Sequence, residues 1–203
     1  MHERILRAAV ERFDSHGVEA TRIDDICAAA DVAQKTFFNH FPTRQHLVRE
    51  IAVAFLDELV ATLEETRRET GTTAQRLERF FTRVAAEAAT ARPMRRTLVM
   101  EVIRLVHDDR LEAEQGRRLH ASFGALIRDG VRAGDVSRTH SVAVLTEIVV
   151  GAYYSLMLGW LGTDRYPIRA RAIGIARLLR DALAAGRSHE LAAVRSRATA
   201  GRS

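Results

Sequence analysis

Cysteine is nearly absent from this sequence, since Cys27 is the only one in 203 residues. A single cysteine cannot form an internal disulfide or supply the thiolate set of a cysteine zinc site. A reducing, cytoplasmic setting is therefore expected. Cys27 falls on the apolar side of a predicted helix, so we favour a small core residue over a redox sensor.

Proline and glycine are also scarce, with 3 Pro and 12 Gly, and 47% of the residues are hydrophobic. Alanine, leucine, arginine and glutamate are frequent, and these residues favour helix over strand. No alternating strand pattern and no internal repeat is visible. A chain of this length can bury a substantial core, as one large domain or two smaller ones. The sequence therefore predicts an all-α protein.

Enzyme signatures are missing as well. We find no nucleophile elbow, P-loop or zinc-ligand spacing, and no convergent set of acid, base and nucleophile. The chain is therefore expected to be no enzyme and to need no cofactor. The run "HDD" at 107–109 can be a metal site or a solvated helix end, and we favour the helix end.

Long hydrophobic runs are limited to "SVAVLTEIVVGAYYSLMLGWLG", residues 141–162. This run is just long enough to cross a bilayer, but it contains Glu147, Ser155 and three glycines. We interpret it as a helix buried on most sides against other helices, and expect no membrane partner. The N-terminus "MHERILRAAVERF" carries acids, so it is not expected to be a secretory signal.

Helical periodicity, interrupted at Gly17, Gly71, Pro93 and Pro167, divides the chain unequally. The pattern predicts a helix-turn-helix domain at 1–46, a larger helical domain at 47–186 and a disordered basic tail at 187–203. Helices are expected at 3–16, from Thr21 to about 30, at 34–41, 43–68, 73–90, 94–107, 111–133, 139–161 and 167–185.

The first three helices show local signals at their ends. Gly17 is typical of a helix C-terminus. Thr21 and Asp24 are three residues apart, which resembles a capping box at the start of the second helix. Asp31 occupies the turn, where a left-handed residue is needed. In the third helix, Phe37 and Phe41 are four residues apart and are expected to point into the core.

Two short helices joined by a tight turn, with polar groups at the start of the second, form a helix-turn-helix. In this motif the second helix enters the DNA major groove. Lys35 can donate to guanine, Gln34 can pair with adenine, and an outward Phe38 can pack against sugar or a thymine methyl. Residues 1–50 hold seven Lys and Arg against eight acids. Binding must therefore depend on local placement and on two copies. The predicted DNA contacts are Thr21, Arg22, Gln34, Lys35, Thr36, Phe38, Asn39, His40 and Arg44.

The run "ATRIDDICAAADVAQKTFFNHFPTRQHLV", 20–48, resembles the N-terminal domain of TetR/AcrR-family transcriptional regulators. The resemblance covers about residues 3–50. Matching positions are Thr21, Ile26, Ala30, Val32, Thr36, Phe38, His40, Phe41, Thr43, Arg44 and Leu47.

The sequence departs from the family pattern at four positions. Cys27 replaces the usual Ala, Asp31 the usual Gly, Ala33 the usual Ser and Phe38 the usual Tyr. Loss of the hydroxyl at Ala33 removes an N-cap from the recognition helix, at a cost of about 1 kcal/mol. Loss of the Tyr hydroxyl at Phe38 removes one expected phosphate contact.

The resemblance implies that the later helices bind a small ligand and form a homodimer. An apolar or amphipathic effector suits the candidate lining. If it carried phosphates, as an acyl-CoA does, Arg95, Arg96 or Arg104 could bind them. An ordinary packed core is the alternative for these residues. The candidate lining is Phe80, Phe81, Val84, Met100, Ile103, Phe123, Ile127, Tyr153, Tyr154 and Met157.

The sequence thus predicts a homodimeric, ligand-responsive regulator, a repressor by expectation, that binds a palindromic double-stranded DNA operator. The alternative is an all-helical lipid- or drug-binding protein with a vestigial helix-turn-helix. The two hypotheses differ in whether Lys35 and Asn39 matter for DNA affinity.

Overall fold

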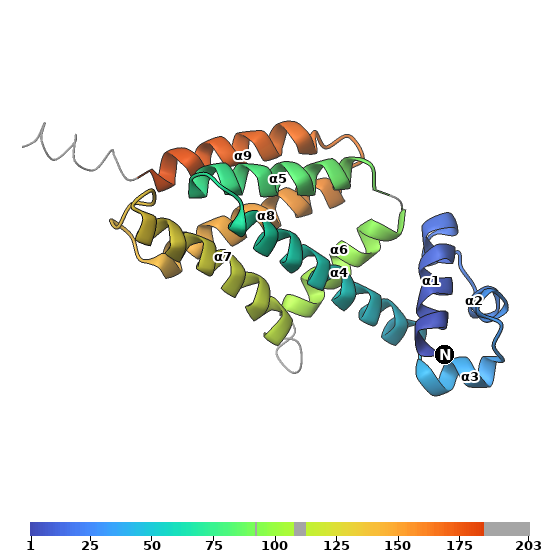
Figure 1. Ribbon diagram of the computed structural model, residues 1–203. Helices are drawn as coiled ribbons and strands as arrows, with labels where there is room; N and C mark the ends of the chain where they lie inside the picture. The colour runs from blue at the N-terminus through green and yellow to red at the C-terminus, as the bar shows by residue number, and fades with distance from the viewer. Residues whose placement is uncertain (92, 108–112, 185–203) are drawn as a thin grey trace, which may run out of the picture.

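The computed structural model describes residues 1–91, 93–107 and 113–184, and within them it contains nine α-helices and no strand (Figure 1). The all-α prediction is confirmed. The predicted tail at 187–203, and Asp108 and Asp109 of the "HDD" run, lie outside the described residues. The helices are α1 (His2–His16), α2 (Ile23–Ala30), α3 (Gln34–His40), α4 (Arg44–Arg68), α5 (Thr73–Ala89), α6 (Pro93–His107), α7 (Ala113–Ala133), α8 (Val142–Gly162) and α9 (Ile168–Leu183).

Helices α1 to α3 form a small unit at one end of the molecule (Figure 1). α1 is followed by its C-cap Gly17, whose φ of 84° is a conformation that glycine adopts without steric cost. The turn between α2 and α3 is made by Asp31 in the left-handed conformation, with φ 50° and ψ 55°. Arg4 of α1 donates to the carbonyl oxygen of Asp31 at 2.7 Å, which holds this turn against α1.

The predicted N-cap of α2 is wrong by one residue. Arg22 is the N-cap, and its backbone N–H donates to the Asp25 carboxylate at 3.1 Å. Thr21 is only 2% exposed, and its hydroxyl donates to the carbonyl oxygen of Gly17 at 2.8 Å. The hydrogen bond forms because a buried hydroxyl needs a partner. It stabilises the α1–α2 loop.

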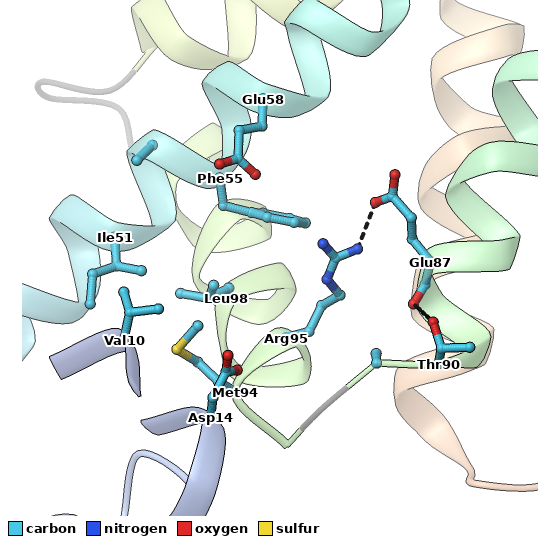
Figure 2. A pocket seen from close by; sticks show the side chains of 12 residues that line it. Val10, Asp14, Ile51, Phe55, Glu58, Glu87, Thr90, Met94, Arg95 and Leu98 are labelled. Atoms are coloured by element: carbon cyan, nitrogen blue, oxygen red, sulfur yellow. Dashed lines mark hydrogen bonds and ion pairs between the residues drawn. The ribbon is translucent and has the colours of Figure 1, made fainter. Parts of the chain in front are cut away.

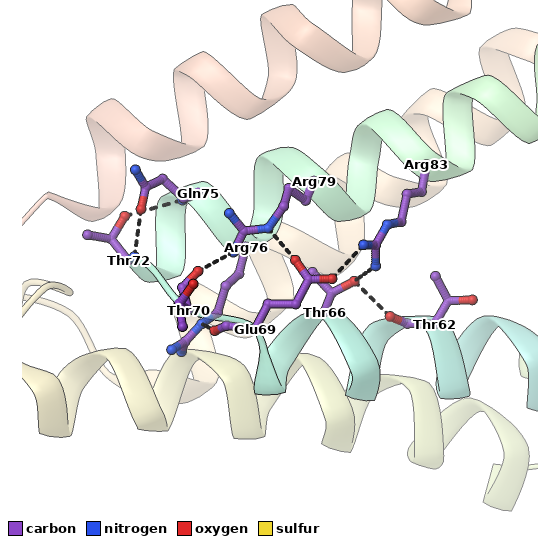
Figure 3. Close-up of polar contacts among 9 residues, drawn as sticks. All are labelled: Thr62, Thr66, Glu69, Thr70, Thr72, Gln75, Arg76, Arg79 and Arg83. Atoms are coloured by element: carbon purple, nitrogen blue, oxygen red, sulfur yellow. Dashed lines mark hydrogen bonds and ion pairs between the residues drawn. The ribbon is translucent and has the colours of Figure 1, made fainter.

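Helix α4 connects the small unit to the larger bundle, and the predicted domain boundary between residues 46 and 47 falls inside it. Its N-terminus is capped by Thr43, which accepts from the backbone N–H of His46 at 3.2 Å. Just beyond its C-terminus, Glu69 lies 2.5 Å from both Arg79 and Arg83 of α5 (Figure 3). These ion pairs fix the α4–α5 corner.

The larger bundle packs α5 along α9 and α7 against α8. Its centre is aromatic: Phe80, Phe81 and Phe123 are fully buried, and the Phe80 and Phe123 rings meet edge to face at 5.3 Å. Such pairs are the preferred aromatic geometry. Side chains therefore fill the bundle around Phe80 and Phe123.

Helix α8 is long and apolar enough to cross a membrane by length and composition, yet 33% of its most apolar window is buried. The prediction that it is buried on most sides is wrong for a single chain. Val144, Ile148 and Leu158 are 47%, 58% and 51% exposed, and Ile173 and Leu178 of α9 are exposed as well. One chain therefore carries an apolar face built from α8 and α9.

Candidate nucleic-acid interface and ligand cavity

Helix α3 buries one side and exposes the other, as its sequence predicts. Phe37 is 0% exposed and Phe41, which caps the helix, is 1% exposed. Phe38 is 44% exposed, although its ring meets that of Phe37 edge to face at 5.3 Å. Gln34, Lys35, Asn39 and His40 are also exposed, and Thr36 is half-buried.

Lys35 is the only lysine or arginine of α3, it is exposed, and its ammonium forms no ion pair with the described residues. Gln34 donates its amide to the carboxylate of Asp24 on α2. Arg22 lies 3.7 Å from the same carboxylate. Asp24 therefore holds the polar groups of α2 and α3 together, and an incoming phosphate would compete with it for Arg22.

Three of the predicted contact residues also have structural roles. Arg44 donates to the carbonyl oxygen of Val18 at 3.0 Å, linking α4 to the α1–α2 loop. His40 lies near His2, with ring centroids 5.7 Å apart. Thr21 is buried and bonded to backbone, so its hydroxyl is committed within the domain. The other predicted contacts gather on the exposed side of α3 and at the start of α2.

A cavity of about 400 Å³ opens where the small unit meets the bundle, and we call it the outer chamber (Figure 2). α1 contributes Val10 and Asp14, α4 contributes Ile51, and α6 contributes Met94 and Leu98. It therefore contacts the helix-turn-helix unit and the bundle at once. The rest of its wall is Ala54, Phe55, Glu58, Glu87, Thr90, Ala91 and Arg95.

A smaller cavity of about 150 Å³, the inner chamber, lies deeper in the bundle. Phe55, Glu58, Glu87 and Arg95 line both chambers. The remaining wall of the inner chamber is mostly apolar and includes Leu59, Val84, Val99, Tyr153, Met157 and Trp160.

Arg95 stands between the two chambers. Its guanidinium lies over the Phe55 ring, 5.1 Å from the centroid, and donates to Glu87 at 2.6 Å (Figure 2). Burial raises the pKa of Tyr153 well above its ordinary value, so this phenol stays protonated. Tyr153 is 3% exposed, and its hydroxyl forms no hydrogen bond within the described residues.

The predicted ligand residues are only partly brought together. Val84, Tyr153 and Met157 line the inner chamber. Met100 is 40% exposed and faces a separate groove of about 360 Å³, which Arg96 and Arg104 also line. The other six line neither chamber and belong to the packed interior: Phe80, Phe81, Phe123 and Ile127 are fully buried, and Ile103 and Tyr154 are half-buried.

Sequence reasoning missed Phe55, Glu58, Glu87 and Trp160. Phe55 lies within the helix that the sequence predicts at 43–68, but nothing in the sequence distinguishes Glu58 and Glu87 from ordinary solvated positions on a helix. Cys27 is 5% exposed, and burial together with the charge of Asp24 raises the pKa of its thiol. Its thiol is therefore unreactive at neutral pH, as expected of a core residue. No group of three metal-ligating side chains occurs among the described residues.

A family model described as "Bacterial regulatory proteins, tetR family" matches residues 5–51. The HTH-type transcriptional repressor KstR2 of Mycobacterium tuberculosis is 29% identical over 77 residues, which is 38% of this chain and 38% of that protein. The chain thus matches less than half the length of this curated relative.

Solved structures match much more of the chain. The transcriptional regulator FadR of Bacillus subtilis in complex with stearoyl-CoA superposes with a TM-score of 0.68 at 17% identity, over 90% of this chain and 100% of that chain. FadR of Thermus thermophilus in complex with lauroyl-CoA gives 0.66 at 20% identity, over 90% and 94%. At these identities the likeness shows the fold alone.

Proposed function

We propose that the chain is a TetR-family transcriptional regulator, that it binds a palindromic operator as a homodimer, and that a small apolar or amphipathic effector releases it. It acts as a cytoplasmic repressor in this proposal. The match of the tetR family model to residues 5–51 supports this proposal. The observation that carries it is the exposed polar side of α3, which the buried Phe37 and Phe41 hold in a fixed orientation.

The DNA contacts follow from what α3 exposes. Lys35, at the N-terminal end of the helix, is suited to guanine O6 or N7, and Asn39 one turn later is suited to phosphate or a base edge. Phe38 offers its ring to sugar or a thymine methyl. Gln34 must leave Asp24 to pair with adenine. Thr36, His40, Arg22 and Arg44 lie at the margins of this surface, and Thr21 contributes through position rather than through its hydroxyl.

Two copies are needed because one recognition helix of seven residues reads too few bases for a selective site. The exposed apolar face of α8 and α9 suits a second copy, since monomers rarely expose a large continuous apolar surface. A two-fold pair would set the two recognition helices about 35 Å apart, one turn of DNA.

The effector acts by changing this spacing. Its site in the proposal is the pair of chambers, whose walls come from α1 as well as from α4 and α6. A bound molecule would shift α4 relative to the bundle and turn the recognition helices away from adjacent half-sites. Crystal structures with and without effector that show α4 in one position, while operator binding is lost, would contradict this mechanism.

Fluorescence anisotropy on duplexes from upstream of the protein's own gene tests DNA binding directly. We expect selective binding whose affinity falls steeply with salt, because phosphate contacts release counterions. Lys35→Ala should weaken operator binding by about 1–3 kcal/mol. Arg138→Ala, which removes an exposed cation far along the chain, is the matched control and should bind normally.

The alternative of a binding protein with a vestigial helix-turn-helix makes the opposite prediction. Lys35→Ala and Asn39→Ala would then leave every activity intact, and no genomic fragment would be enriched by the purified protein. Selection of bound fragments from total genomic DNA therefore separates the two hypotheses even if the upstream duplex is the wrong DNA.

A further inference from the structure

The Arg95 guanidinium marks a place built for a cation. It lies on the face of Phe55 and beside the carboxylate of Glu87 (Figure 2). An aromatic face with an adjacent carboxylate is the environment that proteins use to bind guanidinium and ammonium groups. Arg95 remains 29% exposed by its side chain, so a ligand arriving through the outer chamber can reach this place.

The charges around the two chambers are unbalanced. Asp14, Glu58 and Glu87 line them, whereas Arg95 is the only cation among the described lining residues. Arg95 is already paired with Glu87, and Glu58 has no side-chain partner in the described part of the chain. Glu58 and Glu87 together oppose the single guanidinium of Arg95, so an anionic group would be repelled by this part of the wall and a cationic group would be attracted to it.

The inner chamber adds a preference for a compact apolar group. Its volume of about 150 Å³ is that of a cavity that admits one benzene ring. Tyr153 contributes its hydroxyl to this wall, and the charges of Arg95 and Glu87 act on that hydroxyl. Buried tyrosine hydroxyls normally have a hydrogen-bond partner, so this unpartnered one is free to contact a ligand.

We propose that the two chambers bind a small lipophilic cation, with an aromatic or branched apolar group in the inner chamber and a protonated amine or quaternary ammonium between Phe55, Glu58 and Glu87. The bound cation displaces the Arg95 guanidinium from Phe55 and Glu87. This inference rests on the proposed function, because it names the chemical class of the effector. It also places the charged end beside Val10 and Asp14 of α1, next to the DNA-binding unit.

The only tryptophan of the chain, Trp160, lines the inner chamber and reports on its occupancy. Its fluorescence is titrated with (3-phenylpropyl)trimethylammonium, with the neutral isostere (4,4-dimethylpentyl)benzene and with 3-phenylpropyl phosphate. The quaternary ion should bind about tenfold tighter than the hydrocarbon. The phosphate should bind more weakly than either of them.

Carboxylate variants test the origin of this selectivity. Glu58→Gln and Glu87→Gln should each weaken binding of the quaternary ion by about three- to tenfold and leave hydrocarbon binding unchanged. Glu78→Gln is the matched control. It removes an exposed acid that lies on α5, as Glu87 does, but outside both chambers, and it should leave the binding of all three probes unchanged. Arg95→Gln should tighten binding of the quaternary ion, because it removes the cation that competes for Glu87.

The proposal is overturned if the quaternary ion does not bind, or if the phosphate binds as tightly and loses affinity in Arg95→Gln. Operator anisotropy without any probe is measured on the same samples. Retained operator binding without cation selectivity would overturn this inference alone, whereas cation selectivity without operator binding would overturn the regulator function alone.

Discussion

Ala33 leaves the first amides of α3 without a side-chain acceptor. It occupies the N-cap position with extended φ and ψ of −73° and 150°, which is the conformation a capping serine adopts. Ala33 is exposed, so a hydroxyl there meets no steric barrier. Ala33→Ser should therefore raise the free energy of unfolding by about 0.5–1 kcal/mol. Urea denaturation followed by circular dichroism measures the change.

Ala29→Ser is the matched control, because Ala29 is exposed and lies in the last turn of α2 rather than at an N-cap. There the same substitution should lower the free energy of unfolding by a few tenths of a kcal/mol, since serine is a poorer helix former than alanine. Equal effects at both positions would mean that the N-terminus of α3 gains no hydrogen bond from the new hydroxyl.

At the scale of whole helices, α4 is joined to α7 by a charged pair. Arg67 donates to Asp129 at 2.6 Å, and it also pairs with Glu64 one turn earlier. The side chains of Arg67 and Asp129 are 31% and 27% exposed. The hydrogen bond from Arg67 lowers the pKa of Asp129 below its ordinary value, and this outweighs the partial burial of the carboxylate. Protonation of Asp129 must therefore weaken the α4–α7 contact.

The direction of the pH dependence follows from this lowered pKa. The contribution of Asp129 to stability is fully present above its unfolded pKa, about 4, and is lost as the pH falls through its lower folded value. Asp129→Asn should reduce the free energy of unfolding by about 1–2 kcal/mol at pH 7. The difference from the unmodified chain should shrink as the pH falls below about 4.

Denaturation at a series of pH values measures this difference. Asp164→Asn is the control, because its side chain is 93% exposed beside Arg96, and exposed pairs contribute little. A difference at Asp129 that stays constant down to pH 2 would show that the ion pair with Arg67 is not its cause.

Helix boundaries were largely predictable because their signals are local. Thr43, Gly17 and Asp31 each act within a few residues, and the structure confirms all three. The N-cap predicted at Thr21 was wrong because the contact that decides it is not local. The Thr21 hydroxyl bonds to Gly17 across a loop, a contact that competes with capping and that no spacing rule reveals.

The cavity was less predictable than the helices. The sequence offered Phe80, Phe123 and Tyr153 as cavity lining or as packed core, and only three-dimensional packing decides which side chains meet and which leave a gap. Phe80 and Phe123 fill the bundle, whereas Tyr153 also faces the inner chamber. The pairing of Arg95 with Glu87 and Phe55 was invisible because these residues come from three different helices.

At the scale of the whole molecule, the exposed face of α8 and α9 is the surface through which we propose that two copies assemble. Ile148 is the most exposed large apolar residue of α8 at 58%, and Leu178 is the most exposed of α9 at 67%. Because neither side chain is packed within the chain, replacing one of them should not unfold a single copy. It should instead act on contact with a second copy, where burial of a charge without a partner is costly.

Ile148→Asp should therefore convert the proposed dimer into folded monomers, as measured by sedimentation velocity, with an unchanged circular dichroism spectrum. Full-operator affinity should fall by about a hundredfold or more, since linked half-sites gain that much from simultaneous binding. Binding to an isolated half-site should not change, because α3 is far from the substitution along the chain.

Ala121→Asp, at an exposed position of α7, is the control and should remain dimeric. A dimer that survives Ile148→Asp and Leu178→Asp together would place the interface elsewhere on the chain, and the spacing mechanism would then need a different two-fold axis.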